Sequence, residues 1–215
     1  MKGPVTLLCH VALISSLVVG TVAAGPPEHP VVVVIPMGAV DAVLVDSVVN
    51  TLREVTLMEV RVDPARAFPD GAYDALSGRY HADAALDDVE DRFPRGAWKA
   101  LVVTQEELSV AEHGMPDRTL VGWARVRGKS AIVSVRTMIT RSHTLASLQR
   151  RVGNLVLHEV GHTLGLRHCP VGGCVMADSG GSPVTWADRS TQGYCVLCRL
   201  RLRQGLLRPL RGSTV

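Results

Sequence analysis

The stretch "HEVGHTLGLRHC" at residues 158–169 gathers three histidines and a glutamate around two glycines. On a helix each residue turns by about 100°, so His158 and His162 lie on one face, one turn apart, and their imidazoles can share a metal ion. Gly165 permits the left-handed conformation that ends a helix and turns the chain back. His168 can therefore become a third ligand.

Three imidazoles leave one position of a tetrahedral zinc ion open for water, which a catalytic zinc site requires. Zinc lowers the pKa of such a water toward neutrality, and Glu159 is placed to accept its proton as the general base. The pattern therefore predicts hydrolysis of a peptide bond by a zinc-activated water. Two alternatives remain at this point: a non-catalytic zinc-binding or interaction protein, and a zinc hydrolase that acts on a non-peptide acyl substrate.

A second cluster is formed by cysteines. Cys169 directly follows the third histidine, Cys174 lies five residues on, and Cys195 and Cys198 form a C-x-x-C pair. Two short chelating pairs favour a closed tetrathiolate site, so we expect two zinc ions per chain, one catalytic and one structural. The alternative is a pair of disulfides, because thiols oxidise outside the cytoplasm.

The N-terminus is typical of an exported protein. Lys2 precedes an apolar run over 5–22, and small residues precede Gly25, which predicts a signal peptide at 1–24 and a single mature domain at 25–215. Cleavage would give a secreted or periplasmic protein without membrane contact. An uncleaved segment would be a membrane anchor, and a misassigned start codon would leave the protein cytoplasmic.

Composition narrows the class of partner. The 215 residues are 47% hydrophobic, enough for one compact core, and 23 basic residues nearly balance 20 acidic ones. We therefore expect a monomer that acts on a peptide or protein substrate and binds no nucleic acid. The arginine-rich stretch at 198–211 could contact nucleic acid or an anionic membrane, but we interpret it as a solvated helix end.

The segments before the histidines predict a β-α-β unit. The β-branched run at 31–38 favours a buried strand, apolar spacing over 40–55 favours an amphipathic helix, and 56–64 favours a second, parallel strand. Further on, the sequence predicts irregular chain at 65–79 and a weak helix at 80–93. It then predicts a third strand at 97–108 and a hairpin formed by two strands at 120–126 and 130–136.

A long helix must carry the histidines. Apolar residues recur at helical spacing from Leu145 to Leu166, and Ser142 or Thr144 can cap the start of this helix. The metal-binding pattern would lie on its last turns, where packing against the sheet provides a rigid support.

Taken together, "HEVGHTLGLRHCPVGGCVM" and the later "CVLC" resemble the archaemetzincin family of zinc metallopeptidases, and "VVTQEEL", "VGWARV" and "AIVSVRTM" are similar to its upstream strands. The resemblance implies an α/β, metzincin-like domain with a mixed twisted sheet, a long active-site helix and a C-terminal helical segment held by zinc. It also implies catalytic zinc on the three histidines, Glu159 as base, structural zinc on the four cysteines, and a turn at Met176 beneath the catalytic metal.

The sequence departs from the family pattern in three places. Between Met176 and Cys195 lie 18 residues, one more than the pattern, an insertion that a loop tolerates. The segment "TQEE" lacks the aspartates expected after its threonine, so we interpret Glu106 and Glu107 as solvated loop carboxylates. A signal peptide is also not typical of the family.

Overall fold

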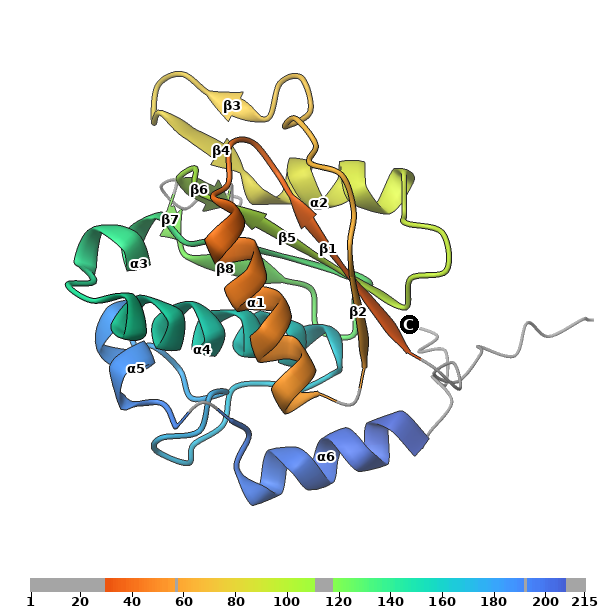
Figure 1. Ribbon diagram of the computed structural model, residues 1–215, viewed down its shortest axis with the longest axis vertical. Coiled ribbons are helices and arrows are strands. Elements are labelled where there is room, and N and C mark those ends of the chain that lie inside the picture. Colours follow the sequence, from red (N-terminus) through yellow and green to blue (C-terminus); the bar gives the residue numbers. More distant parts are fainter. Residues whose placement is uncertain (1–29, 57, 111–117, 192, 208–215) are drawn as a thin grey trace, which may run out of the picture.

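The computed structural model describes residues 30–56, 58–110, 118–191 and 193–207 (Figure 1). The predicted signal peptide at 1–24 lies outside these ranges. Within the described ranges, no helix combines the length and the apolar character needed to cross a membrane.

The main sheet has five strands in the order β2-β1-β5-β9-β8. Four strands are parallel, namely β1 (Val31–Pro36), β2 (Glu59–Val62), β5 (Lys99–Thr104) and β9 (Ser130–Ser134), and β8 (Gly122–Ala124) is antiparallel at one edge. The parallel pairing of β1 with β2 and the hairpin of β8 with β9 confirm the sequence predictions. The edge position of β8 leaves one side of that strand unpaired within this sheet.

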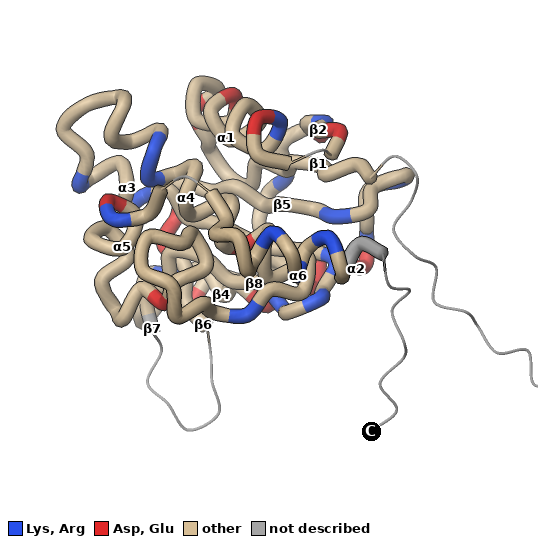
Figure 2. The backbone as a smooth tube through the Cα atoms, turned by 90° about the horizontal axis from the view of Figure 1, so that it is seen from below, with Lys and Arg blue, Asp and Glu red and all other residues tan. Residues whose placement is uncertain are grey.

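Helices cover both faces of the sheet, which explains the uninterrupted β-branched runs. Val32 and Val34 share one core with α1 (Ala42–Val55) and α4 (Leu145–Thr163), whereas Val33 and Ile35 share the other with α2 (Ala82–Asp91). Figure 2 shows α1 and α2 on opposite sides of β1 and β5. The sheet is thus a middle layer, and α4 rests on one of its faces.

A second, smaller sheet corrects two expectations. It has the order β3-β4-β6-β7, with bounds Tyr73–Asp74, Arg79–His81, Leu108–Val110 and Arg118–Leu120. The segment 65–79 is therefore not wholly irregular, and 97–108 is not one strand. The chain turns after Thr104, because the Thr104 hydroxyl accepts a hydrogen bond from Glu106 N and the Glu106 carbonyl accepts one from Ser134.

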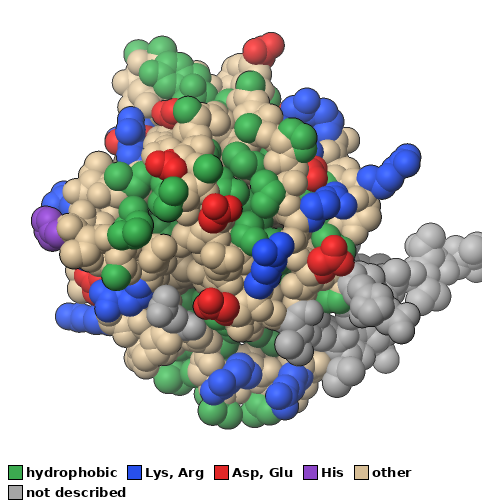
Figure 3. Space-filling view, in the orientation of Figure 1, with side chains coloured by type: hydrophobic (Ala, Val, Ile, Leu, Met, Phe, Trp, Pro, Cys, Tyr) green, Lys and Arg blue, Asp and Glu red, His purple; other side chains and the backbone are tan. Residues whose placement is uncertain are grey.

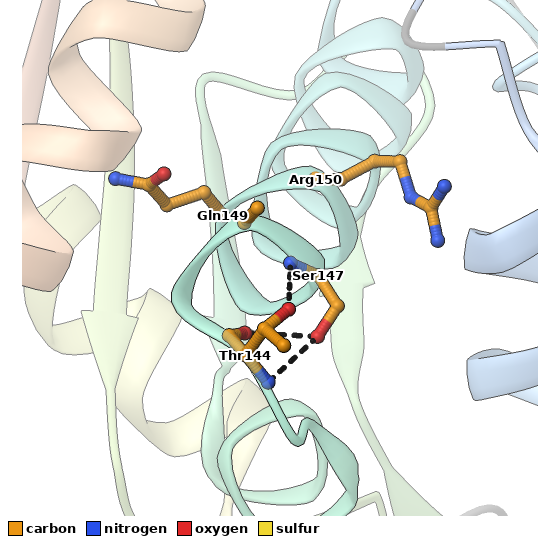
Figure 4. Close-up of a pocket in the computed structure, with 5 residues that line it drawn as sticks. Thr144, Ser147, Gln149 and Arg150 are labelled. Atoms are coloured by element: carbon orange, nitrogen blue, oxygen red, sulfur yellow. Dashed lines mark hydrogen bonds between the residues drawn. The ribbon is translucent and has the colours of Figure 1, made fainter.

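The active-site helix α4 begins as predicted from its cap. Thr144 and Ser147 form a capping box in which each side chain meets the other's backbone N–H (Figure 4). The hollow shown in Figure 4 is lined by the first turns of α4 and lies about 16 Å along the helix from His158, so it is separate from the histidines. The helix ends at Thr163, and Gly165 adopts a φ of +94° beyond it.

Three further helices complete the described chain: α3 (Arg136–Arg141), α5 (Pro183–Arg189) and α6 (Val196–Leu207). The C-terminal helix α6 begins within the C-x-x-C pair, which confirms the predicted helical segment beside the cysteines. Figure 3 shows Lys and Arg side chains interspersed with hydrophobic ones over α6 at the lower edge of the molecule. Elsewhere on this face basic and acidic side chains alternate, as the near-neutral composition predicts.

Candidate active site

The structure brings the three histidines of the motif together. The closest ring nitrogens of His158, His162 and His168 all lie within 4.8 Å of one another, and the two Nε2 atoms on α4 are 3.1 Å apart. A tetrahedral zinc ion with Zn–N bonds of about 2.0–2.1 Å has N···N edges of about 3.3 Å. The three side chains therefore have the spacing that a zinc ion needs.

Hydrogen bonds select the ring form that binds metal. His158 Nδ1 lies 2.8 Å from the carbonyl of Val175, and His162 Nδ1 lies 2.8 Å from the carbonyl of Leu166. A carbonyl can only accept, so each Nδ1 donates and each neutral ring keeps the lone pair of Nε2. Burial lowers the pKa of His158 to about 4 and also lowers that of His162. Both rings are therefore held neutral, as metal ligands must be.

Glu159 lies on the same turn of α4 and is buried. Burial raises the pKa of its carboxyl to about 8, and a cation bound nearby would lower that pKa again. The backbone of edge strand β8 approaches its side chain closely, because a Cβ at Gly122 would lie 2.7 Å from Glu159 Cδ. The carboxylate is thus confined between α4 and the sheet edge.

Met176 is fully buried against the same helix. A Cβ at Gly161 would lie 2.5 Å from the Met176 sulfur and 3.1 Å from the ring of Tyr194. The Tyr194 hydroxyl donates to the carbonyl of Leu157 at 2.7 Å. Met176 and Tyr194 therefore pack against α4 at Gly161, where a larger residue would clash with them.

The four cysteines form a separate cluster. Their sulfurs all lie within 4.8 Å of one another, with 3.8 Å between Cys169 and Cys195 and 3.8 Å between Cys174 and Cys198. A disulfide requires about 2.05 Å, so all four are free thiols. A tetrahedral zinc ion with Zn–S bonds of about 2.3 Å has S···S edges of about 3.8 Å, which this cluster matches.

The cysteine pKa values are shifted unequally. Burial raises the pKa of Cys174. At Cys195, burial acts in the same direction, but hydrogen bonds from the Cys198 backbone and from neighbouring thiols outweigh it and lower the pKa to about 7. The cluster therefore contains a thiol that ionises readily, and thiolates are the form that binds zinc.

Comparisons with known proteins agree with this geometry. Residues 36–204 match peptidase family M54. The chain belongs to peptidase family M54. It is 37% identical to the archaemetzincin of Methanopyrus kandleri over 155 residues, covering 71% of this chain and 82% of that protein. It is 30% identical to the archaemetzincin of Natronomonas pharaonis over 176 residues, covering 79% and 97%.

Solved structures show the same fold. The crystal structure of Methanopyrus kandleri archaemetzincin superposes on this M54 peptidase with a TM-score of 0.71 and 30% identity, covering 85% of this chain and 99% of that one. The archaemetzincin of Archaeoglobus fulgidus, solved in complex with malonate, gives a TM-score of 0.67 at 27% identity, covering 79% and 99%. The archaemetzincin resemblance and the α/β fold are confirmed, and the protein is a zinc-dependent peptidase that acts on peptide or protein substrates.

Three residues around the site of this M54 peptidase escaped the sequence analysis. Asp178 Oδ2 lies 3.2 Å from His168 Nδ1, the ring of Trp186 lies edge-on to His158 with centroids 5.0 Å apart, and Gly122 contacts Glu159. Asp178 carried one signal, since it lies just beyond Met176 and metal-binding histidines often pair with a carboxylate. The other two are long-range contacts without a local pattern.

Proposed function

We propose that peptide-bond hydrolysis takes place at His158, His162 and His168, with Glu159 as the general base. The observation that carries this proposal is the convergence of three ring nitrogens beside a buried carboxylate on one helix. Zinc, when bound by these histidines, polarises the scissile carbonyl and makes water more acidic.

Glu159 moves the protons in this proposal. Its carboxylate removes a proton from the attacking water and delivers it to the nitrogen of the leaving amine. Burial raises the proton affinity of this carboxylate, a zinc ion bound nearby would lower it again, and the confinement by Gly122 keeps the carboxylate in place. His158 and His162 are held in position by their Nδ1 hydrogen bonds, so little reorganisation accompanies the reaction.

We also propose that Cys169, Cys174, Cys195 and Cys198 hold a second, structural zinc, giving two ions per chain. Their tetrahedral sulfur spacing supports this assignment over two disulfides. Such a site would fasten the start of α6 to the loop that follows His168.

The sequence motivates a proposal about location. We propose that the chain is exported by the segment 1–24 and then acts as a monomer away from the membrane, because the apolar run and the small residues before Gly25 suit cleavage there. Sequencing the N-terminus of protein recovered outside the cytoplasm tests this, and a retained Met1 in that fraction would contradict it. Light scattering of the same sample tests the monomer.

Replacing Glu159 by Gln tests the catalytic assignment. We expect kcat/KM for a peptide substrate to fall about 100-fold to 10,000-fold while the zinc content stays unchanged, because the amide cannot accept the proton. Glu107→Gln is the matched control, since Glu107 is half exposed and pairs with Arg79 and Arg136 rather than with a histidine of the site. Full activity of Glu159→Gln would contradict the assignment.

A further inference from the structure

The three histidines are supported in different ways. His158 and His162 lie on α4, are largely removed from solvent, and donate to backbone carbonyls. His168 lies beyond the end of that helix, and its side chain is 50% exposed. Its Nδ1 faces the carboxylate of Asp178 at 3.2 Å, so among the described residues the least enclosed of the three rings is the one whose Nδ1 has a charged partner. A charged acceptor makes a stronger hydrogen bond than a neutral one.

Asp178 is itself fixed by the local chain. Its second oxygen, Oδ1, accepts the backbone N–H of Gly180 at 2.9 Å. Gly180 and Gly181 follow with φ values of +56° and +80°, which glycine adopts without strain. The tight turn therefore leaves one carboxylate oxygen free to point at His168.

The segment before Asp178 is tied to the same site. The Val175 carbonyl accepts from His158, the Met176 carbonyl accepts from Cys169 N at 2.8 Å, and Cys174 belongs to the thiol cluster. The histidine cluster and the cysteine cluster thus both hold the start of the loop that presents Asp178. The position of Asp178 relative to His168 is defined as a result.

We propose that Asp178 is a positioning residue that holds His168 in its metal-binding orientation. This inference rests on the function proposed above. The carboxylate fixes Nδ1 as the protonated nitrogen, turns Nε2 toward the other two histidines and increases its electron density. An exposed imidazole without such a partner would rotate freely and would lose that freedom when it bound metal. Retention of metal at the histidine site therefore depends on Asp178.

Metal affinity provides the test. The dissociation constant for zinc at the histidine site is measured by chelator competition at one pH, with the cysteine site kept loaded, for the full chain and for Asp178→Asn and Asp178→Ala. We expect both variants to bind zinc about 10-fold to 100-fold more weakly. The asparagine variant, which keeps a neutral acceptor, is expected to lose less than the alanine variant.

Asp74→Asn is the matched control. Asp74 closes a comparable exposed turn, where its carboxylate accepts from Leu76 N at 3.0 Å and Ser77 N at 3.2 Å, and it lies in the β3–β4 hairpin rather than at the histidines. We expect its zinc affinity to equal that of the unchanged protein. Thermal unfolding of the proteins with only the cysteine site loaded shows whether a variant has lost the fold. If Asp178→Ala does not fold, the comparison of Asp178→Asn with the unchanged protein decides the role of Asp178.

A spectroscopic readout separates positioning from general stability. Cobalt at the histidine site is expected to change its visible absorption in Asp178→Asn, because the orientation of one ligand changes, and to be unaltered in Asp74→Asn. Unchanged zinc affinity and an unchanged cobalt spectrum in Asp178→Asn would overturn the role of Asp178. Failure of the unchanged protein to bind metal at the histidines would instead overturn the proposed function.

Discussion

The Cα of Gly122 on β8 faces the side chain of Glu159 on α4 so closely that a methyl group there would lie 2.7 Å from both Cγ and Cδ of the glutamate. Real Cβ atoms do not approach other carbon atoms to that distance. The position of the proposed base, Glu159, therefore depends on the absence of a side chain at Gly122 of β8, which is at the edge of the main sheet.

Substituting Gly122 by Ala is expected to displace Glu159 and to lower kcat/KM about 100-fold, since a misplacement of about 1 Å has that effect on catalytic groups. The buried Glu159 side chain must shift to make room for the methyl group, so the free energy of unfolding should fall by about 1–3 kcal/mol. Steady-state kinetics and urea unfolding measure the two effects. Gly172→Ala is the control, because a Cβ there meets no atom of the described residues within 4 Å. Unaltered kinetics in Gly122→Ala would refute this account.

Gly161→Ala is expected to destabilise the protein although alanine favours helices by about 1 kcal/mol. Its Cβ would lie 2.5 Å from the buried Met176 sulfur and 3.1 Å from Tyr194. Overpacking of this kind costs about 1–3 kcal/mol, so we expect a net loss in thermal or urea unfolding. Gly153→Ala on the same helix meets the hydroxyl of Thr51 at 3.0 Å and should lose less. A gain in stability for Gly161→Ala would show that Met176 does not pack there as described.

The sequence predicted the elements whose pattern is local. The continuous apolar run in β1 and the apolar residues at helical spacing in α1 and α4 each reflect burial along a single segment. Thr144, as a capping residue, marked the start of α4. The short strands of the second sheet carry no such pattern, and β4 pairs with β6 across 28 residues, from His81 to Ser109. The second sheet was therefore missed, and β6 was merged with β5.

The residues of the site likewise divide into those that a local sequence pattern indicates and those that only tertiary packing brings together. The histidines and cysteines are close in sequence at spacings that metal binding requires, so their gathering could be predicted. Gly122 and Glu159 are 37 residues apart, and Trp186 reaches His158 from another helix. Contacts of this kind follow from tertiary packing, and no spacing rule in a single sequence indicates them.

Lys99 gives the stability a pH dependence. Its buried Nζ donates to the carbonyls of Gly128 at 2.7 Å and Thr163 at 2.9 Å, and burial lowers its pKa from 10.5 to about 8. Between these two values the unfolded chain holds a proton that the folded chain has released, so the free energy of unfolding rises with pH. We expect this rise to be on the order of 2 kcal/mol between pH 8 and pH 10.

Lys99→Met is expected to abolish that rise, because the methionine does not titrate. Urea unfolding at both pH values, compared with the unchanged protein, isolates the contribution from other titrating groups. Lys129→Met, which removes an exposed lysine nearby, should retain the pH dependence. An equal rise in Lys99→Met and the unchanged protein would contradict the assignment to Lys99.

Cys198→Ser is expected to release the structural zinc and to destabilise the fold before it affects the histidines. Cys198 is fully buried, and its sulfur lies 3.8 Å from that of Cys174. The zinc content should fall by about one ion per chain, with a loss of several kcal/mol in the free energy of unfolding. Full zinc content and full stability in this variant would rule out the second metal site.

Elemental analysis of zinc in the purified mature protein, beside a thiol titration in denaturant without reductant, tests whether the histidines and the cysteines each hold a zinc ion. We expect about two zinc ions and four free thiols, which are those of the cluster, because Cys9 leaves with the segment 1–24. One zinc ion with the cluster thiols oxidised would retain the catalytic site and replace the structural metal with disulfides. A chain without zinc would contradict the account of the histidine site.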